Sequence, residues 1–124
     1  MPPPAPNSAP HSAPAPALAA TPQPPYWAVI FTSLRDERPG DGYGQTADRM
    51  VELGSRQPGF LGLESARGSD GLGVTVSYWS SLEAIAAWKA VAEHEAAQRA
   101  GRARWYHAFA TRVARVEREA VFQR

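Results

Sequence analysis

The run LGVTVSYW at residues 72–79 has the most regular alternation in the chain. Leu, Val, Val and Tyr occupy every second position, and small residues followed by a final Trp occupy the others. A period of two is typical of a β-strand. The preceding GSDG at 68–71 is typical of a hairpin connection, and residues 60–67 show a similar alternation before it. The sequence therefore predicts two antiparallel strands, 60–67 and 72–79.

Working toward the N-terminus, the next two elements are a helix and a strand. Residues 43–56 place apolar side chains at helical spacing, and the QPGF turn at 57–60 ends that helix. Residues 36–42 contain Pro and Gly and are predicted to be a loop. Before the loop, YWAVIFTSLR at 26–35 is aromatic and β-branched, which predicts a strand with two apolar faces.

Working toward the C-terminus, a second helix and a last strand complete the pattern. Ser80 or Ser81 is expected to cap a helix that runs to about Gly101, and residues 106–122 alternate loosely as a fourth strand. The order β-α-β-β-α-β is the split βαβ, or ferredoxin-like, arrangement. The predicted fold class is therefore α+β, with a four-stranded antiparallel sheet and two helices on one face.

The other face of this sheet is expected to need a partner. The strand at 26–35 is apolar on both faces, but the helices cover only one of them. A domain of this size buries only about two-thirds of its unfolded surface by itself. We therefore expect a homodimer that forms through the sheet face.

The composition divides the chain at residue 25. Ten of the 12 prolines lie in residues 1–25, and all 25 charged side chains follow them. Residues 1–25 are expected to be a disordered Pro/Ala-rich tail that can be deleted without loss of dimerisation or thermal stability. Residues 26–124 are expected to form one domain. The tail lacks a basic region and an apolar core long enough for a signal peptide, so a cytoplasmic location is expected.

Several classes of function are excluded. The chain has no Cys, which excludes a disulfide scaffold, and its apolar runs are too short for a membrane span. Its net charge of +1 and the lack of a stacking platform on 71–79 argue against nucleic acid. HEAAQ at 94–98 starts like a zinc-binding helix, but Gln98 replaces the second His, so no metal site is predicted.

The remaining candidates for chemistry are mostly aromatic. Trp79, Trp88 and Trp105 flank the second helix, where they either fill the core or line a cleft between the helices and the sheet. His94 is the best candidate for an acid or base. In an unbroken helix it lies nearly opposite Trp88, so only a break between residues 90 and 93 would bring both into one pocket.

Four stretches give the chain a family resemblance: YWAVIFTS (26–33), RMVELGSRQPGFLG (49–62), GVTVSYWSSLEAIAAWK (73–89) and residues 94–117. Together they resemble the antibiotic biosynthesis monooxygenase (ABM) superfamily of dimeric α+β barrel proteins. The resemblance implies a homodimer with a pocket in each subunit and oxygenation of an electron-rich aromatic or polyketide-like substrate by O2 without a cofactor.

The resemblance also suggests roles for individual residues. Trp88 would orient the aromatic ligand, Thr32 or Ser33 would donate a hydrogen bond to its oxygens, and His94 would accept a proton. Arg112 would stabilise a phenolate or superoxide anion. The remaining substrate-binding candidates are Tyr78, Trp79 and Phe109.

Two alternatives have the same fold. One is a stress or ligand-binding protein without oxygenase activity, which a pocket collapsed around Trp79, Trp88 and Phe109 would favour. The other is a haem-binding or haem-degrading protein. Trp88 matches the helical Trp of the haem-degrading members, but Gln98 stands where they have the iron-ligating His, and the first strand offers no Asn.

Overall fold

The computed structural model describes residues 17–99 and 105–124 of the 124-residue chain, and it confirms the predicted element order. The elements are β1 (Tyr26–Arg35), α1 (Tyr43–Ser55), β2 (Phe60–Arg67), β3 (Leu72–Trp79), α2 (Leu82–Arg99) and β4 (Tyr106–Val116). The fourth strand ends at Val116, earlier than the alternation suggested. The predicted helix end at Gly101 lies outside the described residues.

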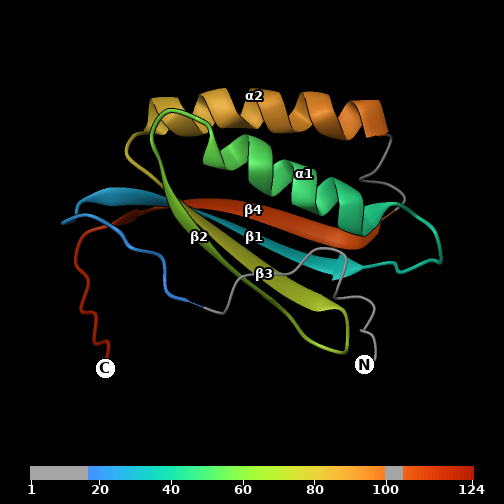
Figure 1. Cartoon of the computed structure of the whole chain (residues 1–124), viewed down its shortest axis with the longest axis horizontal. Helices are drawn as coiled ribbons and strands as arrows, with labels where there is room; N and C mark the ends of the chain where they lie inside the picture. Colours follow the sequence, from blue (N-terminus) through green and yellow to red (C-terminus); the bar gives the residue numbers. More distant parts are fainter. Residues whose placement is uncertain (1–16, 100–104) are drawn as a thin grey trace.

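The four strands form one antiparallel sheet in the order β2-β3-β1-β4. Figure 1 shows both helices on the same side of this sheet. Because β1 and β3 pair with Phe31 opposite Thr75, the odd-numbered residues of both strands share one face, which is the face beneath the helices. Within the described ranges, neither helix is long and apolar enough to span a membrane.

Local chemistry explains where the helices begin. The Ser81 hydroxyl accepts a hydrogen bond from the Ala84 amide at 3.0 Å, which confirms one of the two expected caps of α2. At the start of α1, the Asp41 carboxylate accepts the Tyr43 amide at 3.0 Å, and Gly42 has a positive φ of 76°. This loop therefore fixes the direction in which α1 leaves the sheet.

The helix-free face of the sheet exposes apolar side chains. Leu34, Leu72 and Val74 retain 41%, 46% and 39% of their surface there. Exposed apolar patches on a sheet commonly mark contact surfaces. This face therefore has the apolar character that the homodimer prediction requires.

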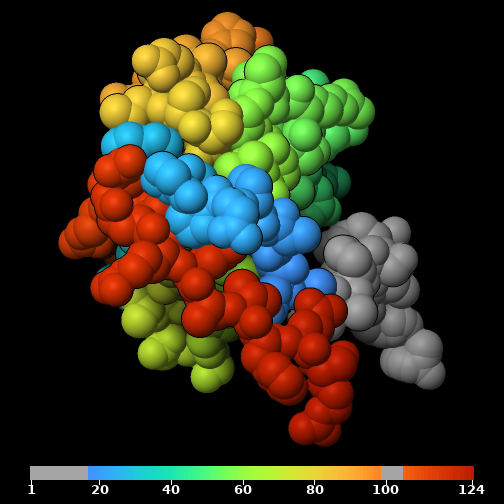
Figure 2. Space-filling view, turned by 90° about the vertical axis from the view of Figure 1, so that its left-hand side faces the viewer, coloured from blue at the N-terminus to red at the C-terminus, as the bar shows by residue number. Residues whose placement is uncertain are grey.

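Part of the expected tail packs against this face, from β2 to the segment that follows β4. The Ala19 amide donates to the Glu64 carboxylate at 2.9 Å, and the Thr21 hydroxyl donates to Glu119 at 2.7 Å. The Tyr26 hydroxyl also donates to Glu119, at 2.6 Å. Figure 2 shows the blue N-terminal segment beside the red C-terminal segment. Residues 17–25 thus contact the domain, whereas residues 1–16 of the expected tail lie outside the described part of the chain.

Candidate functional site

A cavity of about 590 Å³ lies between the two helices and the sheet. This volume falls within the range of pockets that bind small organic molecules. The cavity is walled mainly by apolar and aromatic side chains from all six elements. Representative members are Val29, Phe31, Met50, Trp79, Trp88 and Val113.

One end of the cavity is closed by stacked tryptophans. Trp79 is fully buried, and its ring lies 6.1 Å from that of Trp88 with 20° between the planes. Gly54 of α1 packs against the six-membered ring of Trp88, since a Cβ added at residue 54 would lie 3.4 Å from Trp88 Cζ2. A flat aromatic surface is therefore fixed between α1 and the sheet.

The opposite end is aromatic and polar. The Tyr106 ring makes edge contacts with Phe31 and Tyr43 at centroid distances of 5.6 and 5.8 Å. The Tyr106 hydroxyl donates to the Tyr43 hydroxyl at 3.4 Å, and Arg67 Nη2 donates to the same oxygen at 3.3 Å. Burial raises the pKa of Tyr106 above its ordinary value of 10.0, so its phenol is protonated at neutral pH.

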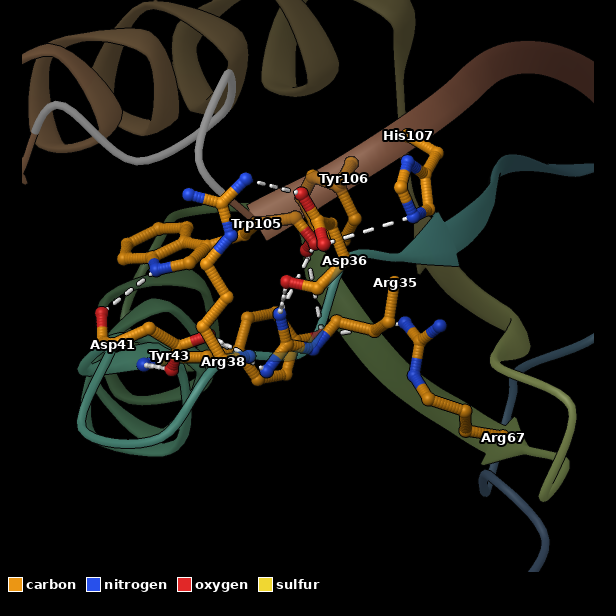
Figure 3. A network of polar contacts seen from close by, with 9 residues as sticks. All are labelled: Arg35, Asp36, Arg38, Asp41, Tyr43, Arg67, Trp105, Tyr106 and His107. Carbon is orange, nitrogen blue, oxygen red and sulfur yellow. Dashed lines mark hydrogen bonds and ion pairs between the residues drawn. The ribbon is translucent and has the colours of Figure 1, made fainter.

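A network of polar contacts holds the loop between β1 and α1 at this end (Figure 3). Arg35 Nη2 pairs with the Asp41 carboxylate at 3.1 Å, and both side chains are at least nine-tenths buried. Arg35 Nη1 also donates to the Trp105 carbonyl at 3.0 Å, while Trp105 Nε1 donates to the Asp41 carbonyl at 2.8 Å. The loop is therefore tied to both β1 and the residue before β4.

The electrostatics of Asp41 follow from these contacts. The hydrogen bond from the Tyr43 amide, assisted by the Arg35 guanidinium, lowers the pKa of the Asp41 carboxyl below its ordinary value of 3.8 despite burial. Asp41 is therefore ionised across the neutral range.

Four of the eight predicted site residues lie on the cavity side of the sheet. Trp79 and Trp88 line the cavity. Ser33 is almost fully buried on the same face of the sheet, where its hydroxyl accepts a hydrogen bond from Arg67 Nη2 at 2.8 Å. Phe109 contacts the rings of Phe31 and Tyr106 but keeps 43% of its surface exposed.

Ser33 and Phe109 do not themselves line the cavity, and the other four predicted residues are not brought to it either. Thr32, Tyr78 and Arg112 lie on the helix-free face, since each alternates with a neighbour that lines the cavity. His94 is exposed on α2, which runs without a break from residue 82 to residue 99. Trp88 and His94 therefore do not meet in one pocket.

Tyr43 and Arg67 are among the polar cavity residues that were not predicted. A signal for Arg67 existed, because the inward-facing series Leu63, Ser65 and Arg67 continues the alternation of β2. No pattern indicated Tyr43, because its position depends on the loop that precedes it. These two residues add a cation and a phenol to a cavity that the sequence suggested only as aromatic.

The described residues provide few ligands for a metal ion or for haem. Within ranges 17–99 and 105–124, no group of three or more His, Cys, Asp or Glu side chains is arranged to hold a metal ion. The described residues that line the cavity include no His. They therefore offer no imidazole as an axial ligand for haem.

Comparison with known proteins identifies relatives. The family model described as "Antibiotic biosynthesis monooxygenase" matches residues 28–100. Uncharacterized protein YqjZ of Bacillus subtilis (strain 168) is 55% identical over 106 residues, which cover 86% of this chain and 92% of that protein.

Solved structures share the fold at lower identity. A mutant of SnoaB from Streptomyces nogalater, described as a cofactor-independent oxygenase, is 18% identical with a TM-score of 0.64. The match covers 79% of this chain and 98% of SnoaB. Rv0793 from Mycobacterium tuberculosis is 19% identical with a TM-score of 0.62, over 77% of this chain and 99% of Rv0793. At these identities the structural likeness concerns the fold.

Proposed function

Since this chain belongs to the antibiotic biosynthesis monooxygenase family, we propose that it oxygenates a planar, electron-rich aromatic substrate with O2 and without a cofactor. The observation that carries the proposal is the cavity of about 590 Å³, which has a flat tryptophan wall at one end and hydroxyl groups at the other. An anthrone or a polycyclic phenol matches this combination, because it is flat, apolar and carries oxygen on one edge.

The reaction uses electrons that the substrate itself supplies. Loss of a proton from an anthrone CH2 group gives a carbanion, which transfers one electron to O2. The radical and superoxide then combine to form a C–O bond. Loss of water from the resulting peroxide leaves a carbonyl, so one oxygen atom enters the product and the other leaves as water. The sum is CH2 + O2 → C=O + H2O.

The cavity residues have separate roles in this proposal. Trp88 provides the wall on which the aromatic system stacks, and the fully buried Trp79 ring packs behind it and holds it in place. Glu93 on α2 is exposed, as His94 is, but it borders the cavity whereas His94 does not. We therefore assign the Glu93 carboxylate as the proton acceptor in place of His94. Hydroxyl groups at the opposite end stabilise negative charge on the substrate oxygen.

The experiment is oxygen consumption with an anthrone, measured for the wild type and three variants. We expect Trp88→Ala to lower kcat/KM by about tenfold or more, because it removes a stacking surface. Glu93→Gln should lower kcat, whereas His94→Ala is the matched helix control and should retain wild-type activity. Absence of oxygen consumption by the wild type with anthrones and naphthols would refute the proposed function.

We also propose that two copies associate through the helix-free face. Support comes from the exposed apolar side chains of Leu34, Leu72 and Val74 on that face. In such a dimer Thr32, Tyr78 and Arg112 would lie at or near the subunit interface. These three residues would then contribute to subunit contacts, and not to substrate binding or catalysis as the sequence suggested.

A further inference from the structure

The polar end of the cavity contains a guanidinium whose terminal nitrogens are fully used. Arg67 Nη1 donates to the Gly71 and Ser33 carbonyls, and Nη2 donates to the hydroxyls of Ser33 and Tyr43. All four acceptors are neutral. Among the residues described, no carboxylate forms an ion pair with Arg67. Arg67 also borders the cavity, but because its terminal N–H groups already have protein acceptors, its charge is relayed to a bound oxygen through these neighbours.

The Tyr43 hydroxyl is the neighbour that borders the cavity. Its oxygen accepts hydrogen bonds from Arg67 and from Tyr106, at 3.3 and 3.4 Å. Its own proton has no hydrogen-bond acceptor in residues 17–99 or 105–124, so it can be donated to a bound molecule. A phenol that accepts a bond from a cation becomes a stronger donor.

The Tyr43 ring is also fixed in place. The Arg35 guanidinium lies 3.7 Å from the ring centroid, and Trp105 and Tyr106 contact the ring edge-on at 5.8 Å. The Tyr43 amide is held by Asp41 (Figure 3). The hydroxyl therefore keeps its position before a ligand binds, which is the condition under which a hydrogen-bond donor stabilises developing charge best.

We propose that the Tyr43 hydroxyl, polarised by Arg67, binds the ionised oxygen of the substrate, so that the cavity takes hydroxyaromatic compounds as phenolates or enolates. This inference rests on the proposed function and names the charge state of its substrate. Tyr43 would be a catalytic residue, and Arg67 a positioning residue that acts through it.

The geometry favours a single anionic oxygen over a carboxylate. A carboxylate is best bound by two parallel donors, as in a free Arg fork. Here the terminal nitrogens of Arg67 already have protein acceptors, and Tyr43 offers one O–H. A phenolate or enolate oxygen therefore fits this end better than a carboxylate group.

The test uses 6-nitro-2-naphthol, a planar naphthol whose neutral and ionised forms absorb at different wavelengths. The dissociation constants of both forms are measured for the full chain by tryptophan quenching and absorbance over a pH series. We expect the wild type to prefer the ionised form, and Tyr43→Phe to reduce that preference by about tenfold, since charge-assisted hydrogen bonds exceed neutral ones by about this factor. Arg67→Gln should reduce the preference in the same direction, and Arg67→Lys should restore part of it.

The matched control is Tyr78→Phe, which removes a phenol hydroxyl on the helix-free face. It should leave the preference for the ionised naphthol unchanged. A Tyr43→Phe variant that binds both forms as the wild type does would overturn this inference and leave the proposed function standing. If the wild type does not bind the naphthol in either form, both this inference and the proposed function are overturned. A phenolate preference without oxygen consumption would refute the oxygenase and support this inference.

Discussion

Replacing Gly73 with Ala should displace Arg67 while leaving the fold intact. Gly73 lies buried on β3, directly beneath the Arg67 side chain of the neighbouring strand. A Cβ added at residue 73 would lie 2.7 Å from both Nη atoms of Arg67 and closer still to Cζ. These distances are too short for nonbonded atoms, so the guanidinium must move. Because it is the end of a flexible side chain, it can do so without shifting the backbone.

The expected change in stability is small because two effects oppose each other. The almost fully buried Ser33 hydroxyl loses its donor, which destabilises by about 1 kcal/mol. Arg67 is exposed, so its other bonds add little. Replacing Gly in a strand with Ala stabilises by about 0.5–1 kcal/mol. The melting temperature should therefore change by less than about 5 °C.

Gly73→Ala should change ligand binding more than it changes stability. If the guanidinium leaves the Tyr43 oxygen, Gly73→Ala should lower the preference for ionised 6-nitro-2-naphthol by nearly the same factor as Arg67→Gln. Thermal unfolding by circular dichroism and the naphthol titration measure the two quantities separately. In an Arg67→Ala background, Gly73→Ala should have no further effect on the preference and should raise the melting temperature. If Gly73→Ala alone keeps the wild-type preference for the ionised naphthol, the proposed polarisation of Tyr43 by Arg67 is refuted.

Three further predictions concern the cavity, the loop and the sheet face. Trp88→Ala should weaken naphthol binding by about tenfold or more at every pH, since stacking does not depend on ionisation; a loss confined to one charge form would contradict this reading. Asp41→Asn should lower the melting temperature at about pH 6. The difference in melting temperature from the wild type should shrink as the pH falls below the ordinary Asp pKa of 3.8, and it should disappear once the pH has passed the lower pKa that Asp41 has in the folded protein. A difference that persists at about pH 2 would argue against an ionised Asp41 as its source. Val74→Glu should convert a dimer into a monomer in sedimentation experiments, whereas Leu82→Glu, at a comparably exposed position on α2, should not; an unchanged mass for Val74→Glu would count against the proposed interface.

The fold could be predicted because each element carries its own local signal. The alternation of residues 72–79 and the hairpin before it set the register of two strands, and the structure has those bounds. The helices were identified by spacing, and the end of α1 by the Pro-Gly turn. None of these signals requires knowledge of distant contacts.

The site was harder to predict because the first strand is apolar on both faces. Thr32 and Ser33 are adjacent, so only one of them can face the helices, and the apolar pattern of β1 does not say which. The same ambiguity applies to Tyr78 and Trp79 on β3. The structure resolves it in favour of Ser33 and Trp79, and it leaves Thr32 and Tyr78 on the helix-free face.

The loop at 36–42 explains why the phenol end of the cavity could not be read from the sequence. Its Pro and Gly residues are typical of a flexible connection, but Asp41 both accepts the Tyr43 amide and pairs with Arg35. Trp105, 64 residues away in sequence, binds the Asp41 carbonyl. The position of the Tyr43 hydroxyl is thus set by long-range contacts of the loop, whereas its polarisation is set by Arg67 from β2. Changes at Asp41 should therefore alter both stability and ligand charge preference, and Gly73→Ala should alter the preference with only a small change in stability.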